Sequence, residues 1–431
     1  MTGSLSLLGK RRFLPLFVTQ LLGAFNDNLY KNAMVFLIVY DVYQDPAADS
    51  WFSAIATAVF ILPFFLLSAA SGQLADARDK AAIIRIVKAA EIFIMLVGAA
   101  GLLLAWQGLL VDWVAVPLMM LALLAMGVHS TFFGPIKYAI LPQHLEPEEV
   151  LAGTGLVEAG TYIAILFGTI VAGIIPVEAA AVLVILTALV GYATGRYVPP
   201  ALPETTPEPI DWNVLRSSVT LVSATMHIPR LFLAICSISF FWTIGAVLFI
   251  QFPVLAENVL TADKPVASLF LAVFSIGIAI GSVAINRLLK GDVSARFGPV
   301  SVLIMAGFVL WFYRLCGIWR GNTDGTLLSL SDFLAHDMSW MLTGSLLGIA
   351  VFGGMFVVPL YAFLTTTVPK SQAARTVAAN NIVNSGAMVC GALVVTAMNL
   401  IGVSVVDQIL LSALMCLVSA WLAWKLHKAC D

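Results

Sequence analysis

The chain has 431 residues, of which 61% are hydrophobic and only 11% are charged. An ordinary soluble domain is about half apolar and about one quarter charged, so lipid must cover much of this chain's apolar surface. The net charge of −2 argues against nucleic acid as a partner.

About twelve stretches are long and apolar enough to cross a bilayer, which takes about 20 residues. They lie at roughly 13–40, 51–72, 81–105, 113–141, 150–175, 178–197, 231–256, 266–289, 298–319, 339–366, 374–400 and 404–426. Their length and lack of alternation argue against strands. The sequence therefore predicts an all-α integral membrane protein.

The first of these stretches carries polar residues deep in an apolar run. At about 1.5 Å per residue, Asp27 lies slightly past the middle of the span. A charge at that depth costs about 2.5–3.5 kcal/mol on insertion scales. Asp27 and Lys31 are four residues apart, so they can pair on one helical face. Polar groups at this depth need polar partners or a water-filled cavity, and a purely structural pair is the alternative reading.

The loop after the second stretch reads GQLADARDK (72–80) and resembles the loop signature of the major facilitator family, G-x-L-x-D-R-x-G-R-K. Asp79 stands where glycine is usual, and Arg78 is displaced by one position. A glycine lets two helices approach closely, and an aspartate can accept bonds from helix N-terminal amides. We expect Gly72, Asp76 and Arg78 to form a conformational gate rather than a binding site.

The fourth and fifth stretches contribute Lys137, Glu158 and Tyr162 as candidate substrate-binding residues. Lys137 follows Pro135, where a kink is expected, and has snorkelling to the head groups as its alternative role. His129 is expected to be a hydrogen-bonded core histidine. No His, Asp and Glu cluster has metal-ligand spacing, and the five cysteines show no disulfide framework, so we expect neither a metal nor another cofactor.

Residues 198–229 contain six prolines, five of them between residues 199 and 209, and cannot continue a membrane helix. They divide the chain into an N-terminal six-helix bundle (1–197), a linker (198–229) and a C-terminal six-helix bundle (230–431). Most of the 22 Lys and Arg residues fall on the side of the N-terminus when the spans alternate, which predicts cytoplasmic termini and a cytoplasmic linker.

The second half adds polar residues within its spans. They are Gln251 in the seventh stretch and Asn380, Asn381 and Asn384 in the eleventh. Asparagines at this spacing also serve simply to bond neighbouring helices. We expect Asp27, Lys31, Glu158 and the three asparagines to face a common central space between the two halves.

Several segments together resemble the bacterial lysophospholipid transporter family of the major facilitator superfamily. They are RRFLPLFVTQLLGAFNDNLYKNA (11–33), FFGPIKYAILPQHL (132–145), GLVEAGTYIAILFGTIVAG (155–173), FFW (240–242) and GGMFVVPLYAFL (353–364). The likeness is greatest to the membrane half of proteins that fuse this transporter to an acyltransferase. It covers nearly the whole membrane region and implies a major facilitator fold of two six-helix bundles.

The resemblance also implies a function. Relatives of this family flip lysophospholipids inward across the bacterial inner membrane, chiefly lysophosphatidylethanolamine, for reacylation and phospholipid remodelling. Asp27 and Lys137 fall at positions that the family links with substrate handling. Some relatives have an arginine a few residues after the FFW block, whereas residues 246–252 contain no basic residue. This departure bears on head-group preference.

Besides lysophospholipid transport by alternating access, the sequence leaves three alternative functions open. The first is a facilitator for a soluble drug-like or metabolite substrate, possibly proton coupled through Asp27 or Glu158. The second is a membrane acyltransferase, but no histidine has an aspartate five residues further on, so the H-x-x-x-x-D motif is missing from this sequence. We therefore expect an acyltransferase only as a separate partner protein. The third is a scaffold without transport activity, which would not need polar groups at depth.

Overall fold

A computed structural model describes residues 4–42, 46–206, 209–319 and 326–430. Within these ranges the chain is helical apart from its connections and one isolated bridge between Ala262 and Leu328. Eleven helices in this part of the chain are long and apolar enough to cross a membrane. The predicted all-α architecture is confirmed.

The chain divides into two compact units, and the first comprises Met1–Ala224 with Thr365–Ile382. Its helices are α1 (Leu14–Phe36), α2 (Pro46–Ala77), α3 (Lys80–Trp106), α4 (Val116–Ala139), α5 (Leu141–His144), α6 (Pro147–Ile174), α7 (Val177–Gly195) and α8 (Val214–Met226). The beginning of α14 (Ala373–Leu400) also belongs to this unit. The polar residues of α1 lower its hydropathy, and α1 is not among the eleven helices.

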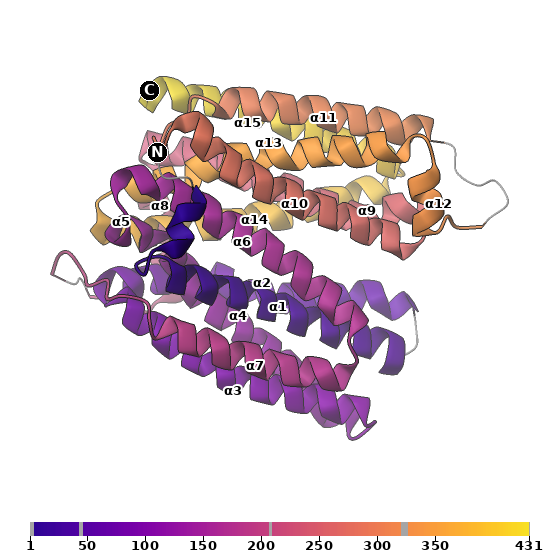
Figure 1. The fold of residues 1–431 in the computed structure, drawn as a ribbon, viewed down its shortest axis with the longest axis horizontal. Helices are drawn as coiled ribbons and strands as arrows, with labels where there is room; N and C mark the ends of the chain where they lie inside the picture. Colours follow the sequence, from indigo (N-terminus) through magenta and orange to yellow (C-terminus); the bar gives the residue numbers. More distant parts are fainter. Residues whose placement is uncertain (1–3, 43–45, 207–208, 320–325, 431) are drawn as a thin grey trace. The chain divides into compact units, whose positions relative to one another are not determined.

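Helix α1 packs along α6 and α7, α2 packs on α4, and α3 packs on α4 and α7 (Figure 1). Glycines make these approaches close. A Cβ at Gly168 of α6 would lie 2.6 Å from the Phe25 carbonyl oxygen, and one at Gly127 of α4 would lie 2.5 Å from that of Phe60. The same surfaces carry the polar residues of the candidate site, so this packing positions them.

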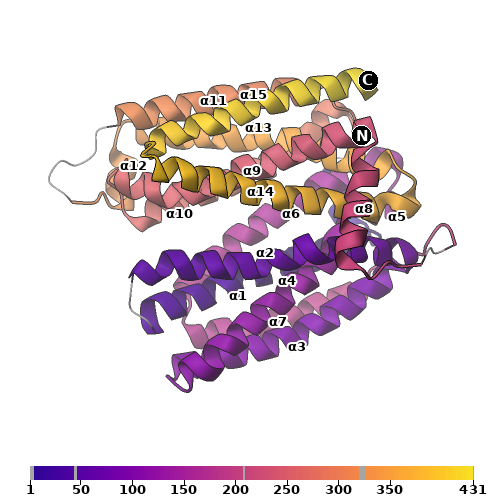
Figure 2. The ribbon, with the colours of Figure 1, turned by 180° about the vertical axis from the view of Figure 1, so that it is seen from behind.

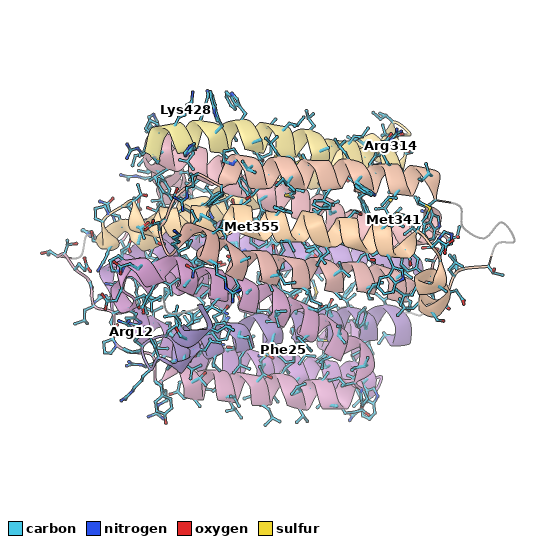
Figure 3. The ribbon with its side chains drawn as sticks, turned by 45° about the horizontal axis from the view of Figure 1, so that its top comes forward. Arg12, Phe25, Arg314, Met341, Met355 and Lys428 are labelled. Atoms are coloured by element: carbon cyan, nitrogen blue, oxygen red, sulfur yellow. The ribbon has the colours of Figure 1, made fainter. Side chains whose placement is uncertain are left out.

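The start of α1 is fixed by charge. Arg12 donates to Glu146 at 2.9 Å and to Glu149 at 2.5 Å, and Lys10 pairs with Glu149. Figure 3 shows Arg12, just before α1, and Phe25 within that helix. These acidic partners belong to the first turn and cap of α6, where the helix dipole favours negative charge. The ion pairs therefore hold the ends of α1 and α6 together.

Helix α8 occupies much of the segment expected to be a linker. It runs across the direction of α2 and α4 rather than along it (Figure 2). Leu215 and Val219, four residues apart on the helix, are about 70% exposed. Helix α8 is thus a short helix with an apolar exposed strip.

The second unit comprises Thr225–Leu364 and Val383–Asp431. Its helices are α9 (Pro229–Asn258), α10 (Lys264–Leu289), α11 (Gly298–Ile318), α12 (Leu330–Ala335), α13 (Ser339–Thr366), the rest of α14 and α15 (Val405–Cys430). Helix α15 packs on α9 and α11. A Cβ at Gly281 would lie 1.9 Å from the Val351 carbonyl oxygen, so α10 and α13 touch backbone to backbone. At the end of α15, Lys428 lies over the Trp424 ring (Figure 3).

Candidate substrate site and conformational contact

Asp27 is partly exposed on α1 and is bonded to α4. The Ser130 hydroxyl donates to its Oδ2 at 2.6 Å, while Oδ1 has no hydrogen-bond partner among the described residues. The spacing allows Asp27 to pair with Lys31, but among the described residues no ion pair joins the two side chains, although their charges interact. The hydrogen-bond partner of the Asp27 carboxylate is therefore the Ser130 hydroxyl and not the Lys31 ammonium. One carboxylate oxygen is thereby left for another group.

Lys137 and Glu158 lie on neighbouring helices of the first unit but do not form an ion pair within the described part of the chain. The Lys137 ammonium donates to Thr161 Oγ1 at 3.3 Å and lies over the Tyr138 ring, 4.9 Å from its centroid. The Tyr138 hydroxyl donates to Glu158, which is fully buried. The Lys137 side chain remains partly exposed, whereas Glu158 is already engaged within the unit.

Gln20 makes a polar contact between α1 and α6. Gln20 accepts a bond from Thr161 at 3.1 Å, so Lys137, Thr161 and Gln20 form a chain from α4 through α6 to α1. Tyr162 is buried, with 3% of its surface exposed. Its role as a substrate contact is not visible in the geometry of this unit.

A second polar cluster in the first unit was missed by sequence reasoning. Glu91 on α3 is fully buried and forms an ion pair with Lys88, one turn earlier. Asn26 on α1 donates to Glu91 Oε1 at 2.8 Å, and His129 Nε2 on α4 lies 3.3 Å from Glu91 Oε2. The position of Glu91 in the middle of an apolar span is the sequence feature that could have revealed this cluster. Lys88 itself is buried, with 1% of its surface exposed.

The candidate amides of the second half fall into both units. Asn380 is fully buried in the first unit, and Asn381 is partly exposed, with its Nδ2 3.5 Å from where a Cβ at Gly134 would stand. In the second unit Asn384 accepts a bond of 2.6 Å from Ser239, and Gln251 donates to Gln408 at 3.1 Å. Asn384 and Gln251 are buried and already have partners.

Gly72 and Asp76 on α2 contact the first turn of α14. Asp76 accepts bonds from the backbone amides of Ala374 at 3.1 Å and Arg375 at 3.0 Å, and the Arg375 guanidinium is 3.7 Å away. A Cβ at Gly72 would lie 2.6 Å from the Ala378 Cβ. The carboxylate thus occupies the positive end of a helix dipole.

Arg78 is exposed, and the basic side chain beside Asp76 is Arg375 instead. The unusual Asp79 has a local role. Its Oδ1 accepts the amide of Ala81 at 3.1 Å as the N-cap of α3, and also the amide of Ala201 at 2.8 Å. An aspartate at this position therefore caps one helix and fixes the chain that follows α7.

That chain segment also covers His144 at the end of α5. The His144 Nε2 lies 3.3 Å from the Pro200 carbonyl oxygen. Burial lowers the pKa of His144, and the bond to Pro200 only partly opposes this effect. A neutral ring is therefore favoured where the start of the linker lies on α5.

Residues 16–389 match the model of the Major Facilitator Superfamily. The chain is 26% identical over 387 residues to "Lysophospholipid transporter LplT" of Serratia proteamaculans (strain 568), which covers 88% of this chain and 86% of the relative. It is 27% identical over 353 residues to the LplT of Photorhabdus laumondii subsp. laumondii, covering 80% and 78%.

Solved structures agree on the fold. The human organic anion transporter MFSD10 (TETRAN) matches with a TM-score of 0.74 at 13% identity, over 96% of this chain and 99% of that one. The proton:xylose symporter XylE matches with a TM-score of 0.69 at 13% identity, over 98% and 96%. The expected major facilitator fold is confirmed. The chain is a multi-pass membrane protein that belongs to the Major Facilitator Superfamily, a family of transporters and not of enzymes.

Proposed function

We propose that the protein transports lysophospholipid, moving it inward across a bacterial inner membrane by alternating access. The similarity to lysophospholipid transporters over most of both chains supports this substrate class. The observation that carries the proposal is a set of membrane-embedded charges of both signs, Asp27, Lys31 and Lys137. Among the described residues, none of the three forms an ion pair.

Lys88 and Glu91 differ from these three residues because they form an ion pair. Those two charges are buried and neutralise each other within α3. Asp27, Lys31 and Lys137 remain partly exposed and have only neutral hydrogen-bond partners or none. A charge without an ion-pair partner near the middle of a span, as at Asp27, costs about 2.5–3.5 kcal/mol. A ligand that brings the opposite charges would recover part of that cost.

A zwitterionic lysolipid head group supplies an ammonium and a phosphate. In the proposed complex the ammonium lies at Asp27, whose Oδ1 lacks a hydrogen-bond partner among the described residues. The phosphate lies at Lys31 or Lys137, which act as point charges. Asn381 can donate or accept, so it suits either group. The acyl chain stays in an apolar phase, which lowers the free-energy cost of moving the lipid.

The proposed transporter lies in the inner membrane and delivers its substrate to an enzyme on the cytoplasmic side. The positive-inside pattern supports a cytoplasmic location of both termini and of the linker, where the product would be delivered. Reacylation there would be carried out by a separate acyltransferase.

The experiment compares ligands on the purified wild-type protein and in proteoliposomes. Lysophosphatidylethanolamine should raise the unfolding temperature more than soluble sugars, organic anions or drug-like cations do. The same lysolipid, labelled, should be taken up faster than the two-chain parent lipid. Stabilisation by a soluble candidate, with no lysolipid uptake, would favour a facilitator for that solute and contradict the proposal.

A further inference from the structure

Helix α8 has a length and a direction that suit the plane of a membrane surface. It has 13 residues, which is about 20 Å at 1.5 Å per residue, whereas the hydrocarbon core is about 30 Å thick. It runs across the direction of α2 and α4, both of which are long and apolar enough to cross a membrane (Figure 2). A helix at a large angle to spanning helices lies along the bilayer surface rather than through it.

The start of α8 is attached to the end of α2. The Asp211 amide donates to Gln73 Oε1 at 2.8 Å, and Gln73 lies four residues before α2 ends at Ala77. Asn213 Oδ1 accepts the amide of Arg216 at 3.0 Å and so caps the new helix. The end of a spanning helix is where the hydrocarbon core gives way to head groups and water. The bond to Gln73 therefore puts the beginning of α8 at that level.

The exposed surface of α8 is divided lengthwise into an apolar strip and a polar strip. Leu215 and Val219, one turn apart, are 69% and 70% exposed, and Trp212, just before the helix, is 66% exposed. The polar strip lies beside them at the same helical spacing and consists of Arg216, Thr220 and Ser223, all of which are exposed. Two exposed strips of opposite polarity are typical of a helix that lies in a membrane interface.

The remaining side of α8 is turned away from solvent. Ser217 is 3% exposed, and Val214 and Leu221 are partly buried. A single exposed leucine is ordinary in a water-soluble protein. Here, however, a serine is buried while Leu215 and Val219 stay exposed, and the serine hydroxyl has no hydrogen-bond partner among the described residues. A helix surrounded by water gains by the opposite arrangement, so the apolar strip needs an apolar environment of its own.

We propose that α8 is an in-plane anchor on the lipid surface at this end of α2, with its apolar strip inserted between the head groups and its polar strip in water. Trp212 suits this position, because indole side chains are enriched at membrane interfaces. Arg216 lies beside the apolar strip, and its guanidinium is a strong partner for phosphate. Its contact with Asp211 is long, at 3.7 Å, and its side chain is 77% exposed, so it stays accessible to lipid. Arg78, directly after α2, is exposed and adds a second cation. The partner is thus a phospholipid surface that carries anionic head groups.

The chain before α8 also contacts the two elements that meet at Asp76 and Arg375. Gln73, which binds the start of α8, lies three residues before Asp76 on α2. On the other side, the Glu204 carboxylate lies 3.7 Å from the Lys370 ammonium, just before α14. An anchored α8 therefore restrains the end of α2 near this contact. This link to conformational change rests on the proposed function, whereas attachment to lipid does not.

Attachment is tested by the environment of single cysteine probes in the full-length protein, in liposomes that contain phosphatidylglycerol. The native cysteines are replaced, and a polarity-sensitive fluorophore is attached at Leu215→Cys on the apolar strip or at Thr220→Cys on the polar strip. The Leu215→Cys probe should emit at a shorter wavelength and be quenched by spin-labelled lipid, whereas the Thr220→Cys probe should be quenched by aqueous iodide.

Two results would overturn the anchor. Equal quenching by iodide at both positions would show that the apolar strip faces water. Protection of the Leu215→Cys probe from both quenchers would show that protein covers the strip, such as a second copy of the chain.

The preference for anionic lipid is tested with the same Leu215→Cys probe. Adding phosphatidylglycerol to phosphatidylcholine vesicles should increase its quenching by spin-labelled lipid, and Arg216→Gln should reduce that increase. Arg296→Gln, at an exposed arginine of the second unit, is the control and should leave the increase unchanged. An increase of the same size in Arg216→Gln would contradict a role of this arginine in binding anionic lipid.

A second pair of variants keeps the native cysteines and tests the link to conformational change. Leu215→Asp with Val219→Asp puts two carboxylates on the apolar strip, and should lower the initial rate of lysophosphatidylethanolamine uptake severalfold in liposomes that contain phosphatidylglycerol. Thr220→Asp with Ser223→Asp adds the same charge to the polar strip and should leave the rate near that of the wild type. Equal effects of the two double variants would overturn the link. If the wild type takes up no lysolipid while the probe results hold, the proposed function alone fails.

Discussion

The Asp76 carboxylate on α2 accepts a 3.0 Å hydrogen bond from the backbone amide of Arg375, whose guanidinium lies 3.7 Å away. Residue 76 and residue 375 are separated by 299 positions in the sequence. The contact combines a charged acceptor, a helix N-terminus and a cation, and charge-assisted bonds of this kind are about twice as strong as neutral ones. It is therefore suited to hold one conformation of a transporter.

We predict that Asp76→Asn lowers the maximal transport rate about tenfold, which corresponds to about 1.4 kcal/mol, with little change in the substrate concentration at half-maximal rate. The amide keeps one acceptor but loses the charge that interacts with the guanidinium and the helix dipole. Initial rates in proteoliposomes over a range of lysolipid concentrations measure both quantities. Asp211→Asn, at an exposed side chain, is the control and should leave the rate unchanged. A large loss of apparent affinity with a normal maximal rate would assign Asp76 to substrate binding instead.

The close approach at Gly72 makes a separate prediction about packing. Gly72→Ala would introduce a Cβ 2.6 Å from the Ala378 Cβ and 3.0 Å from the Ala374 carbonyl oxygen. Overpacking of this kind costs about 1–3 kcal/mol, so the unfolding temperature should fall. Gly307→Ala on α11 is the matched control, because its Cβ would meet no atom within 4 Å. Equal effects at both positions would show that the helix contact is not the cause.

The Lys88–Glu91 pair predicts strong coupling between two substitutions. Lys88→Met leaves a buried carboxylate without its partner, which costs about 3–5 kcal/mol. Adding Glu91→Gln should recover most of that loss, because no uncompensated charge then remains. Unfolding temperatures of the wild type, the two single variants and the double variant form a double-mutant cycle that measures this coupling. Additive losses would contradict a direct interaction inside the protein.

The sequence predicted the helical architecture well because bilayer-spanning helices are set by length and hydropathy. It also located Asp27, Lys137 and Asp76, whose charges stand out in or beside apolar runs. It did not predict their partners. Asp27 and Lys31 have the spacing of an ion pair, yet the Asp27 carboxylate accepts a hydrogen bond from Ser130. Ser130 lies on another helix, and residue spacing within one helix does not predict which helix packs against it.

Lys88, Glu91 and His129 show the same limit. Lys88 lies near the end of a span and is long enough to snorkel, so its sequence position is compatible with the inner surface. Only the packing of α1 and α7, with Gly23 and Gly191 facing the lysine, shows that it is enclosed. His129 was expected to be a core histidine, and it is buried, but its polar neighbours Glu91 and Ser130 come from a different helix and from the next position in the chain.

The most direct test of lysolipid recognition is head-group selectivity in Asp27→Asn, measured as uptake into proteoliposomes. An ethanolamine lysolipid carries the ammonium assigned to Asp27, and a glycerol lysolipid does not. We predict that Asp27→Asn lowers uptake of the ethanolamine lysolipid about tenfold more than uptake of the glycerol lysolipid, as expected from the loss of about 1.4 kcal/mol of charge interaction. Asp337→Asn, at an exposed position, should change neither. An equal loss for both lipids would contradict the account and make Asp27 a structural residue held by Ser130.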